Sequence, residues 1–182
     1  MILRMFRGTP AVPQERLYEE IVAQARRPWL YGAAGVPDTL DGRFDMIVLH
    51  AYLIFDRLRQ ADERAKALAQ AVFDEMFKDM DRSLREMGAS DLAVGPKVRR
   101  MAEVFYGRSR AYSEALQQPG EAGRQGLIAA LARNVFAGHD EGQAAALAAA
   151  LADYVLAEQR ALADRPVERL LSGEAGFTPM PR

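Results

Sequence analysis

Two amphipathic stretches in the first half of the chain constrain its fold more than any other feature. The stretch from Asp38 to Gln60 is apolar on nearly every side, which is typical of a helix that is buried centrally or covered by a partner. The stretch from Asp62 to Met87 repeats apolar residues three and four positions apart, the strongest helical period in the chain. It predicts one long helix, or two helices with a break near residues 79–81. Both stretches are poor in the residue types that enzymes use for chemistry, so they favour a helical binding protein.

Capping and turn residues predict where the other helices begin and end. Pro13 suits the first turn of a helix. Asp41 or Gly42 can cap the central helix, and Gly95-Pro96 is expected to start a later one. Two more helices are expected over residues 122–136 and 142–162. No run alternates apolar and polar residues between turn signals, so no strand is expected. The chain is therefore predicted to be all-α, a compact single-domain bundle of about six or seven helices.

The domain is expected to cover residues 13–172, because a chain of 182 residues suits one domain with a substantial core. Residues 1–12 are expected to form a flexible N-terminus. Residues 173–182, with two prolines and two glycines, are expected to form a flexible tail. The alternative for the N-terminus is a weak membrane-surface contact through Ile2, Leu3, Met5 and Phe6 beside Arg4 and Arg7. The irregular loop RPWLYGAAGVPDTLDG, residues 27–42, contains Trp29 and other large apolar groups, so it must pack down or bind something.

Charge and cysteine content exclude several classes of protein. The 24 Lys and Arg residues nearly balance the 25 Asp and Glu residues, so the chain lacks the basic excess of a dedicated nucleic-acid binder. The absence of cysteine excludes disulfides, thiolate zinc sites and cysteine nucleophiles. The longest apolar stretch, Met46 to Phe55, is too short to span a bilayer and is interrupted by His50. We therefore expect no membrane span and no DNA partner.

Two histidines and one acidic run are the only candidates for chemistry. His50 lies within the most apolar stretch, where it is either a hydrogen-bonded core imidazole or a haem or metal ligand. His139 lies in the turn AGHDEG and is expected to be a solvated or capping residue. The acidic run DEMFKDMD contains Asp74, Glu75, Asp79 and Asp81. Their spacing is poor for sharing one metal ion, so we expect no catalytic residue, metal or cofactor. An enzyme or haem-handling protein would instead use His50 and Asp74.

Charged residues at helix ends and the methionine- and phenylalanine-rich stripe are the candidates for partner binding. Methionine and phenylalanine side chains repack at low cost and suit an adaptable apolar groove, although they can equally form the core. The charged residues are too polar for a core. They either recognise a partner or form an internal ion-pair network that fixes helix packing. The candidate partner-binding residues are Asp41, Arg43, Asp45, Phe73, Phe77, Asp79, Met80, Asp81, Arg82, Arg85, Glu86 and Arg108.

A basic segment, KVRRMAEVFYGRSR, supplies candidates for binding an anionic surface. Its first cations are Lys97, Arg99 and Arg100. A solvated helix face is one interpretation. The alternative is an anionic partner, such as lipid headgroups or ribosomal RNA.

Four segments of the chain resemble a known family. They are DGRFDMIVLHAYLIFDRLR, QAVFDEMFKDMDRSLREMGASDLAVG, KVRRMAEVFYGRSRAYSEAL and, more weakly, LIAALARNVF. These segments, spanning roughly Asp38 to Phe136, resemble the ubiquinol–cytochrome c chaperones, which assist assembly of respiratory complex III. The elements FDEMFKDMDRSLREMG and FYGR are long and distinctive, whereas the alanine-rich C-terminal part matches nothing specific.

The resemblance implies a chaperone without enzymatic activity that binds newly made cytochrome b and assists biogenesis of the ubiquinol–cytochrome c reductase. It further implies a small helical co-chaperone or the ribosome as partners, and peripheral contact with the inner membrane. Because no mitochondrial leader is recognised, it implies a bacterial member that is cytoplasmic or peripheral on the inner membrane. A mature mitochondrial form on the matrix side of the inner membrane is the other possibility. The alternative function is a general helical adaptor at the membrane surface or ribosome, in which the basic segment would dominate.

Overall fold

Eight helices and no strands make up residues 12–179, the part of the chain that the computed structural model describes. They are α1 (Pro13–Ala25), α2 (Pro28–Tyr31), α3 (Leu40–Arg59), α4 (Glu63–Glu86), α5 (Asp91–Leu116), α6 (Gly120–Val135), α7 (Glu141–Ala163) and α8 (Val167–Leu171). The all-α prediction is confirmed, and the six long helices agree with the expected number. The two short helices, α2 and α8, were not expected. The predicted flexible N-terminus and its alternative membrane contact fall on residues 1–11, outside the described residues.

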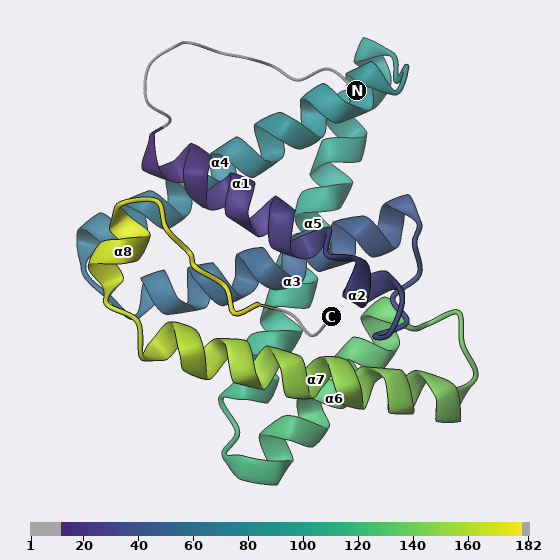
Figure 1. Ribbon diagram of the computed structural model, residues 1–182. Coiled ribbons are helices and arrows are strands. Elements are labelled where there is room, and N and C mark those ends of the chain that lie inside the picture. The colour runs from purple at the N-terminus through teal and green to yellow at the C-terminus, as the bar shows by residue number, and fades with distance from the viewer. Residues whose placement is uncertain (1–11, 180–182) are drawn as a thin grey trace.

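Helix α3 runs through the middle of the molecule, between α1 and α7 (Figure 1). It packs against α1, α4, α5 and α7, and every residue from Asp45 to Ile54 is buried. This central position explains why its sequence is apolar on nearly every side. The predicted cap was wrong, because Thr39 rather than Asp41 or Gly42 is the N-cap. The Thr39 side-chain oxygen accepts a hydrogen bond from the backbone N–H of Gly42 at 3.1 Å.

Helix α4 is one continuous helix of 24 residues, without a break near residues 79–81. The carboxylate of Asp62 caps it by accepting a hydrogen bond from the backbone N–H of Ala65 at 3.0 Å. Its buried side contains Val72, Met76 and Met80, which are four positions apart and therefore lie on one face of the helix.

Helix α5 begins at Asp91, four residues before the predicted start at Gly95-Pro96. Pro96 therefore lies inside the helix, where it removes the hydrogen bond that an N–H would make to the carbonyl of Leu92. Both residues are exposed, so water can reach that carbonyl oxygen. This exposure explains why a residue that normally marks a helix start is tolerated in the second turn. Helices α4 and α5 meet at one end of the molecule (Figure 1).

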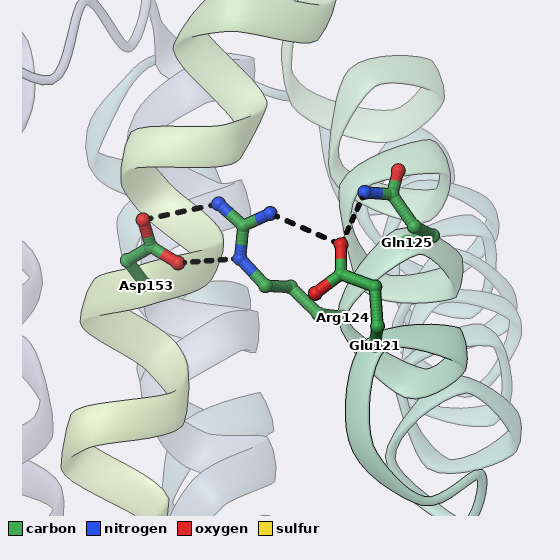
Figure 2. Close-up of polar contacts among 4 residues, drawn as sticks. All are labelled: Glu121, Arg124, Gln125 and Asp153. Atoms are coloured by element: carbon green, nitrogen blue, oxygen red, sulfur yellow. Dashed lines mark hydrogen bonds and ion pairs between the residues drawn. The ribbon is translucent and has the colours of Figure 1, made fainter.

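Helices α6 and α7 form an antiparallel pair in the second half of the chain (Figure 1). Figure 2 shows the polar contact that joins them, in which Arg124 on α6 makes two hydrogen bonds to Asp153 on α7. The donor–acceptor distances are 2.8 Å and 3.2 Å. Glu121 also approaches Arg124, at 3.5 Å, and accepts a hydrogen bond from Gln125 at 2.6 Å.

The loop that contains Trp29 packs onto the domain. Leu30 and Val36 are buried, and the Trp29 ring lies 5.7 Å from the ring of Tyr154 on α7. The expected irregular loop is partly the short helix α2. Among residues 12–179, none of the helices has both the length and the apolar character needed to cross a membrane.

Residues 173–179, which we call the C-terminal strap, follow α8 and run between α1 and α7 (Figure 1). They belong to the tail that was expected to be flexible. Ala175 is fully buried, and the backbone N–H of Gly176 donates a hydrogen bond to the Glu20 carboxylate at 2.7 Å.

Candidate functional site

The predicted partner-binding residues do not form one surface. Asp45 on α3 and Arg108 on α5 form an ion pair with each other in the interior, and 5% and 18% of their side chains are exposed. Burial raises the pKa of the Asp45 carboxyl to about 7, and the neighbouring Arg108 charge opposes that shift. Arg108 also donates a hydrogen bond to the carbonyl oxygen of Asn134 on α6 at 3.4 Å. This pair corresponds to the internal ion-pair alternative, because it links three helices and leaves little of either group exposed.

Aromatic side chains from three helices form the most apolar of the candidate surfaces. We call the half-buried Phe55 of α3, Phe73 and Phe77 of α4, the exposed Tyr106 of α5 and the buried Phe105 that they contact the aromatic surface. The ring centroids of Phe73 and Phe77 are 4.6 Å apart, and that of Phe105 lies 5.4 Å from Phe73 in an edge-on contact. Such pairs contribute roughly 0.5–1.5 kcal/mol each beyond the area they bury. The outermost ring, Tyr106, is 60% exposed.

A groove between α3 and α5 extends from the aromatic surface. Its volume is about 530 Å³, and its walls include Tyr52, Phe55, Phe105 and Tyr106 with the small side chains of Ser109 and Ser113. Charged residues, among them Arg110 and Glu114, lie along its edge. A mainly apolar groove with a charged edge can accept an apolar or amphipathic segment of another protein.

A second groove, which we call the acidic groove, lies between α1 and α4 and has a volume of about 880 Å³. Five carboxylates and two guanidinium groups line it, from Glu15, Glu19, Glu75, Asp79, Glu86, Arg26 and Arg82. Asp79 accepts a hydrogen bond from the Tyr18 hydroxyl at 2.8 Å and pairs with Arg82. Burial, followed by this bond, raises the pKa of the Tyr18 hydroxyl well above its usual range. The excess of carboxylates suits a basic partner segment.

The other predicted partner-binding residues are dispersed. Arg43 pairs with Asp38 at 2.6 Å on the surface, and Asp41 is exposed in the first turn of α3. Arg85 bridges Asp81 of α4, at 2.5 Å, and Asp91 of α5. The remaining member of the set, Met80, is buried in the core.

Exposed cations and exposed apolar side chains occur together where α4 and α5 meet. Lys97, Arg99 and Arg100 are exposed. Arg100 pairs with Glu103 at 3.1 Å, whereas Lys97 and Arg99 have no ion-pair partner among the described residues. Leu92 is 92% exposed and Met87 is 57% exposed. We call these five residues the α4–α5 end.

His50 is fully buried, and both ring nitrogens have hydrogen-bond partners. Burial lowers the pKa of its imidazole to about 4, so the ring is neutral at pH 7. This arrangement corresponds to the hydrogen-bonded core imidazole, one of the two interpretations of His50 from the sequence. Within residues 12–179, no three His, Asp or Glu side chains gather in an arrangement that could hold a metal ion.

Sequence reasoning missed the residues that complete both grooves. Phe55, Phe105 and Tyr18 were not among the predicted partner-binding residues. Their helices meet α4 only in the tertiary structure. The element FYGR, which contains Phe105 and Tyr106, was a signal that could have led to the aromatic surface.

These features together describe an all-helical protein whose exposed grooves suit the binding of other macromolecules. Residues 33–177 match the family model for the ubiquinol–cytochrome c chaperone. The chain therefore belongs to the ubiquinol–cytochrome c chaperone family, as the four sequence segments had indicated.

Relatives from two vertebrates are similar to part of the chain. It is 25% identical over 121 residues to ubiquinol-cytochrome-c reductase complex assembly factor 1 of Xenopus laevis, and 24% identical over 121 residues to the Mus musculus protein of that name. Each match covers 66% of this chain, 58% of the Xenopus protein and 40% of the mouse protein. The chain thus spans about half the length of these relatives.

A solved structure extends the similarity to most of the chain. The crystal structure of the Cbp3 homolog from Brucella abortus is 37% identical in sequence, with a TM-score of 0.79. The superposition covers 91% of this chain and 88% of the Brucella chain. The fold described above is therefore shared with that protein over nearly its whole length.

Proposed function

We propose that this chain is an assembly factor for the ubiquinol–cytochrome c reductase that binds newly made cytochrome b through the aromatic surface and its groove. Membership of the chaperone family and the names of the two vertebrate relatives support the assembly role. The choice of this surface rests on one observation: the Tyr106 ring is exposed and forms part of the wall of a mainly apolar groove. A membrane-embedded subunit exposes long apolar segments before it is assembled. A groove of aromatic rings can cover such a segment without requiring a particular sequence.

A complementation experiment tests this proposal. The gene is deleted, and cytochrome b is measured by reduced-minus-oxidised spectra and by immunoblot of the membranes. We expect selective loss of cytochrome b, restored by the wild-type gene and not by Tyr106→Asp, which places a charge on the exposed ring position. Leu40→Asp is the matched control, since Leu40 is an exposed apolar residue of α3 outside the groove. Both variants must show the wild-type circular dichroism spectrum and melting temperature.

Two outcomes would overturn the proposal in different ways. Normal cytochrome b and normal reductase activity in the deletion strain would remove the assembly role and leave the general adaptor as the leading function. Full rescue by Tyr106→Asp together with loss of cytochrome b in the deletion strain would keep the role but move the client to another surface. The acidic groove is then the next candidate, and Asp79→Asn with Glu86→Gln tests it.

The α4–α5 end is our candidate for a peripheral membrane contact. Leu92 and Met87 can enter the interface of a bilayer, and Lys97 and Arg99 can meet anionic headgroups. Sedimentation with vesicles of phosphatidylcholine, with and without phosphatidylglycerol, measures this binding. We expect binding only to the anionic vesicles, and loss of it in Lys97→Glu/Arg99→Glu. The variant Arg64→Glu/Lys66→Glu makes the same charge change at the other end of α4 and should bind like the wild type.

A further inference from the structure

The C-terminal strap is held through its main chain, in addition to an ion pair between its Glu174 side chain and Arg169 of α8 at 2.8 Å. Four side chains bind four of its backbone groups. Glu20 accepts from the N–H of Gly176 at 2.7 Å, and Glu158 accepts from the N–H of Thr178 at 3.0 Å. Gln24 donates to the carbonyl oxygen of Thr178 at 3.3 Å, and Arg165 donates to the carbonyl oxygen of Ala175. Main-chain hydrogen bonds of this kind hold an extended segment with little regard for its sequence.

Two of the side chains that bind the strap are themselves buried. Glu158 of α7 is fully buried, and Gln24 of α1 is 5% exposed. Burial raises the pKa of the Glu158 carboxyl, and the hydrogen bond from the N–H of Thr178 opposes that shift. Buried polar groups need partners, and the strap's main chain supplies them here. The groove between α1 and α7, which the strap fills, is thus lined by polar side chains that form hydrogen bonds with a polypeptide backbone.

One large apolar side chain anchors the strap, in addition to the buried methyl group of Ala175. The Phe177 ring makes an edge-on contact with the ring of His50, with centroids 5.5 Å apart. The His50 ring in turn lies 5.8 Å from that of Tyr154, which neighbours Trp29. The residues before Phe177 are Ala175 and Gly176. The groove is therefore expected to select peptides that have one aromatic residue preceded by two small residues.

We propose that the groove between α1 and α7 is a binding site for an extended peptide segment of another protein, with an aromatic residue preceded by two small residues, and that the strap occupies it until such a segment displaces it. None of the groove residues belongs to the aromatic surface or the acidic groove. The proposal therefore goes beyond the client contact proposed above. The protein would then contact a partner at a second site, and a partner with a competing segment would take the place of the strap there.

The competition can be measured on the full wild-type chain. A synthetic peptide with the strap sequence GEAGFTP is added in excess, and backbone hydrogen exchange is followed by mass spectrometry. A tethered occupant competes at an effective concentration that is roughly millimolar for a short linker, so the peptide is used in that range. We expect the protection of the Gly176 and Thr178 amides to fall. The same peptide with alanine in place of phenylalanine should leave their protection unchanged.

A weakened strap should expose the site to lower peptide concentrations. In the full-chain variant Phe177→Ala, we expect the fluorescein-labelled peptide to bind at least about tenfold more tightly than to the wild type, by fluorescence anisotropy. Adding Glu20→Ala should then weaken binding about tenfold, because a charge-assisted hydrogen bond is lost. Glu19→Ala is the matched control. It removes a neighbouring carboxylate of α1 that makes no hydrogen bond to the strap.

Three results would overturn the proposal. The first is unchanged amide protection in the wild type at millimolar peptide. The second is equal binding of the peptides with and without phenylalanine by the folded Phe177→Ala variant. The third is a dimer in sedimentation that the Phe177→Ala substitution dissociates, because the occupant would then be the strap of a second copy. These measurements need no cytochrome b, so their failure is distinct from failure of the complementation experiment.

Discussion

The Nε2 atom of His50 on α3 lies 2.8 Å from the hydroxyl oxygen of Tyr154 on α7. The Nδ1 atom lies 2.7 Å from the carbonyl oxygen of Met46. A carbonyl oxygen only accepts, so the ring proton resides on Nδ1 and Nε2 accepts from the Tyr154 hydroxyl. The same hydroxyl accepts from the Gln24 side chain at 3.1 Å. A second proton on His50 would leave the Tyr154 hydroxyl without an acceptor, so this network requires the neutral imidazole.

The neutral state of His50 makes the stability of the protein depend on pH. The pKa is about 4 in the folded chain and near 6.5 when exposed, so between these values the unfolded chain binds one more proton. Stability therefore falls as the pH drops through this range, by about 2 kcal/mol from pH 7 to pH 5. We expect the stability advantage of the wild type over His50→Gln to shrink by about that amount. Urea unfolding of both proteins at each pH measures it.

The wild type must be compared with His50→Gln because Asp45 also titrates in an overlapping pH range. Its effect on stability has the opposite sign to that of His50. Its pKa is raised to about 7, so the folded chain binds the extra proton and stability falls as the pH rises from the ordinary aspartate pKa. The two proteins share this contribution, and it cancels in their difference. A stability difference that stays constant from pH 7 to about pH 5 would contradict the role assigned to His50.

Removal of one partner from the Asp45–Arg108 pair should be strongly destabilising. Asp45→Ala leaves the Arg108 charge in the interior without its carboxylate, which typically costs about 3–5 kcal/mol. In the double variant Asp45→Ala/Arg108→Ala no uncompensated charge is left. We therefore expect the double variant to lose clearly less stability than the sum of the single losses. Urea unfolding of the four proteins gives the coupling energy, and additive losses would argue against a mutual interaction.

Two glycine positions should respond to alanine in opposite directions. A Cβ atom at Gly42 would overlap the carbonyl oxygen of Pro37, whereas one at Gly107 would have no neighbour within 4 Å. Gly42→Ala should therefore lower stability by about 1–3 kcal/mol through overpacking. Gly107→Ala should raise it by up to about 1 kcal/mol, because alanine favours the helix. Thermal unfolding of both variants measures these changes. Equal shifts in Tm would contradict the prediction that the two substitutions have opposite effects.

The contact in Figure 2 should contribute much less than the buried pair. The Asp153 side chain is 60% exposed, so solvent and salt screen its attraction to Arg124. Hydrogen bonding from Arg124 lowers the pKa of Asp153, so the stabilisation is present at neutral pH and lost as the carboxyl protonates in acid. We expect Asp153→Asn to destabilise less than Asp45→Ala, with the difference from the wild type nearly absent in about 1 M salt. A loss as large as that of Asp45→Ala would mean that the exposed contact is not screened.

The helical content could be predicted because its signal is local. The three- and four-residue spacing of apolar residues from Ala65 to Met87 indicated α4 without knowledge of any partner helix. Local signals were less reliable where two of them compete. Gly95-Pro96 is typical of a helix start, yet the helix begins at Asp91 because the hydrogen bond lost at Pro96 lies on an exposed side. Similarly, the sequence predicted Asp41 or Gly42 as the cap of α3, whereas the backbone geometry makes Thr39 the cap.

The candidate sites were only partly predictable, because each combines residues from distant parts of the chain. Phe73 and Phe77 were identified from the sequence, but Phe55 and Phe105 join them only through the packing of α3 and α5 against α4. Asp45 and Arg108 were candidates both for partner binding and for an internal network, and their burial together was needed to show that they pair with each other.

The sequence alone therefore indicated that this protein is all-helical, that the stretch from Asp38 to Gln60 is either central or covered by a partner, and which family it resembles. A helix and its apolar side follow from residues within a few positions of one another. The tertiary structure decided which of those helices share a groove, which charges pair, and that Glu158 and Gln24 hold the strap rather than face water. Those outcomes depend on groups that are far apart in the chain, such as the Gln24 side chain and the Thr178 carbonyl oxygen, which are 154 positions apart. No local sequence pattern predicts the helix packing that brings them together.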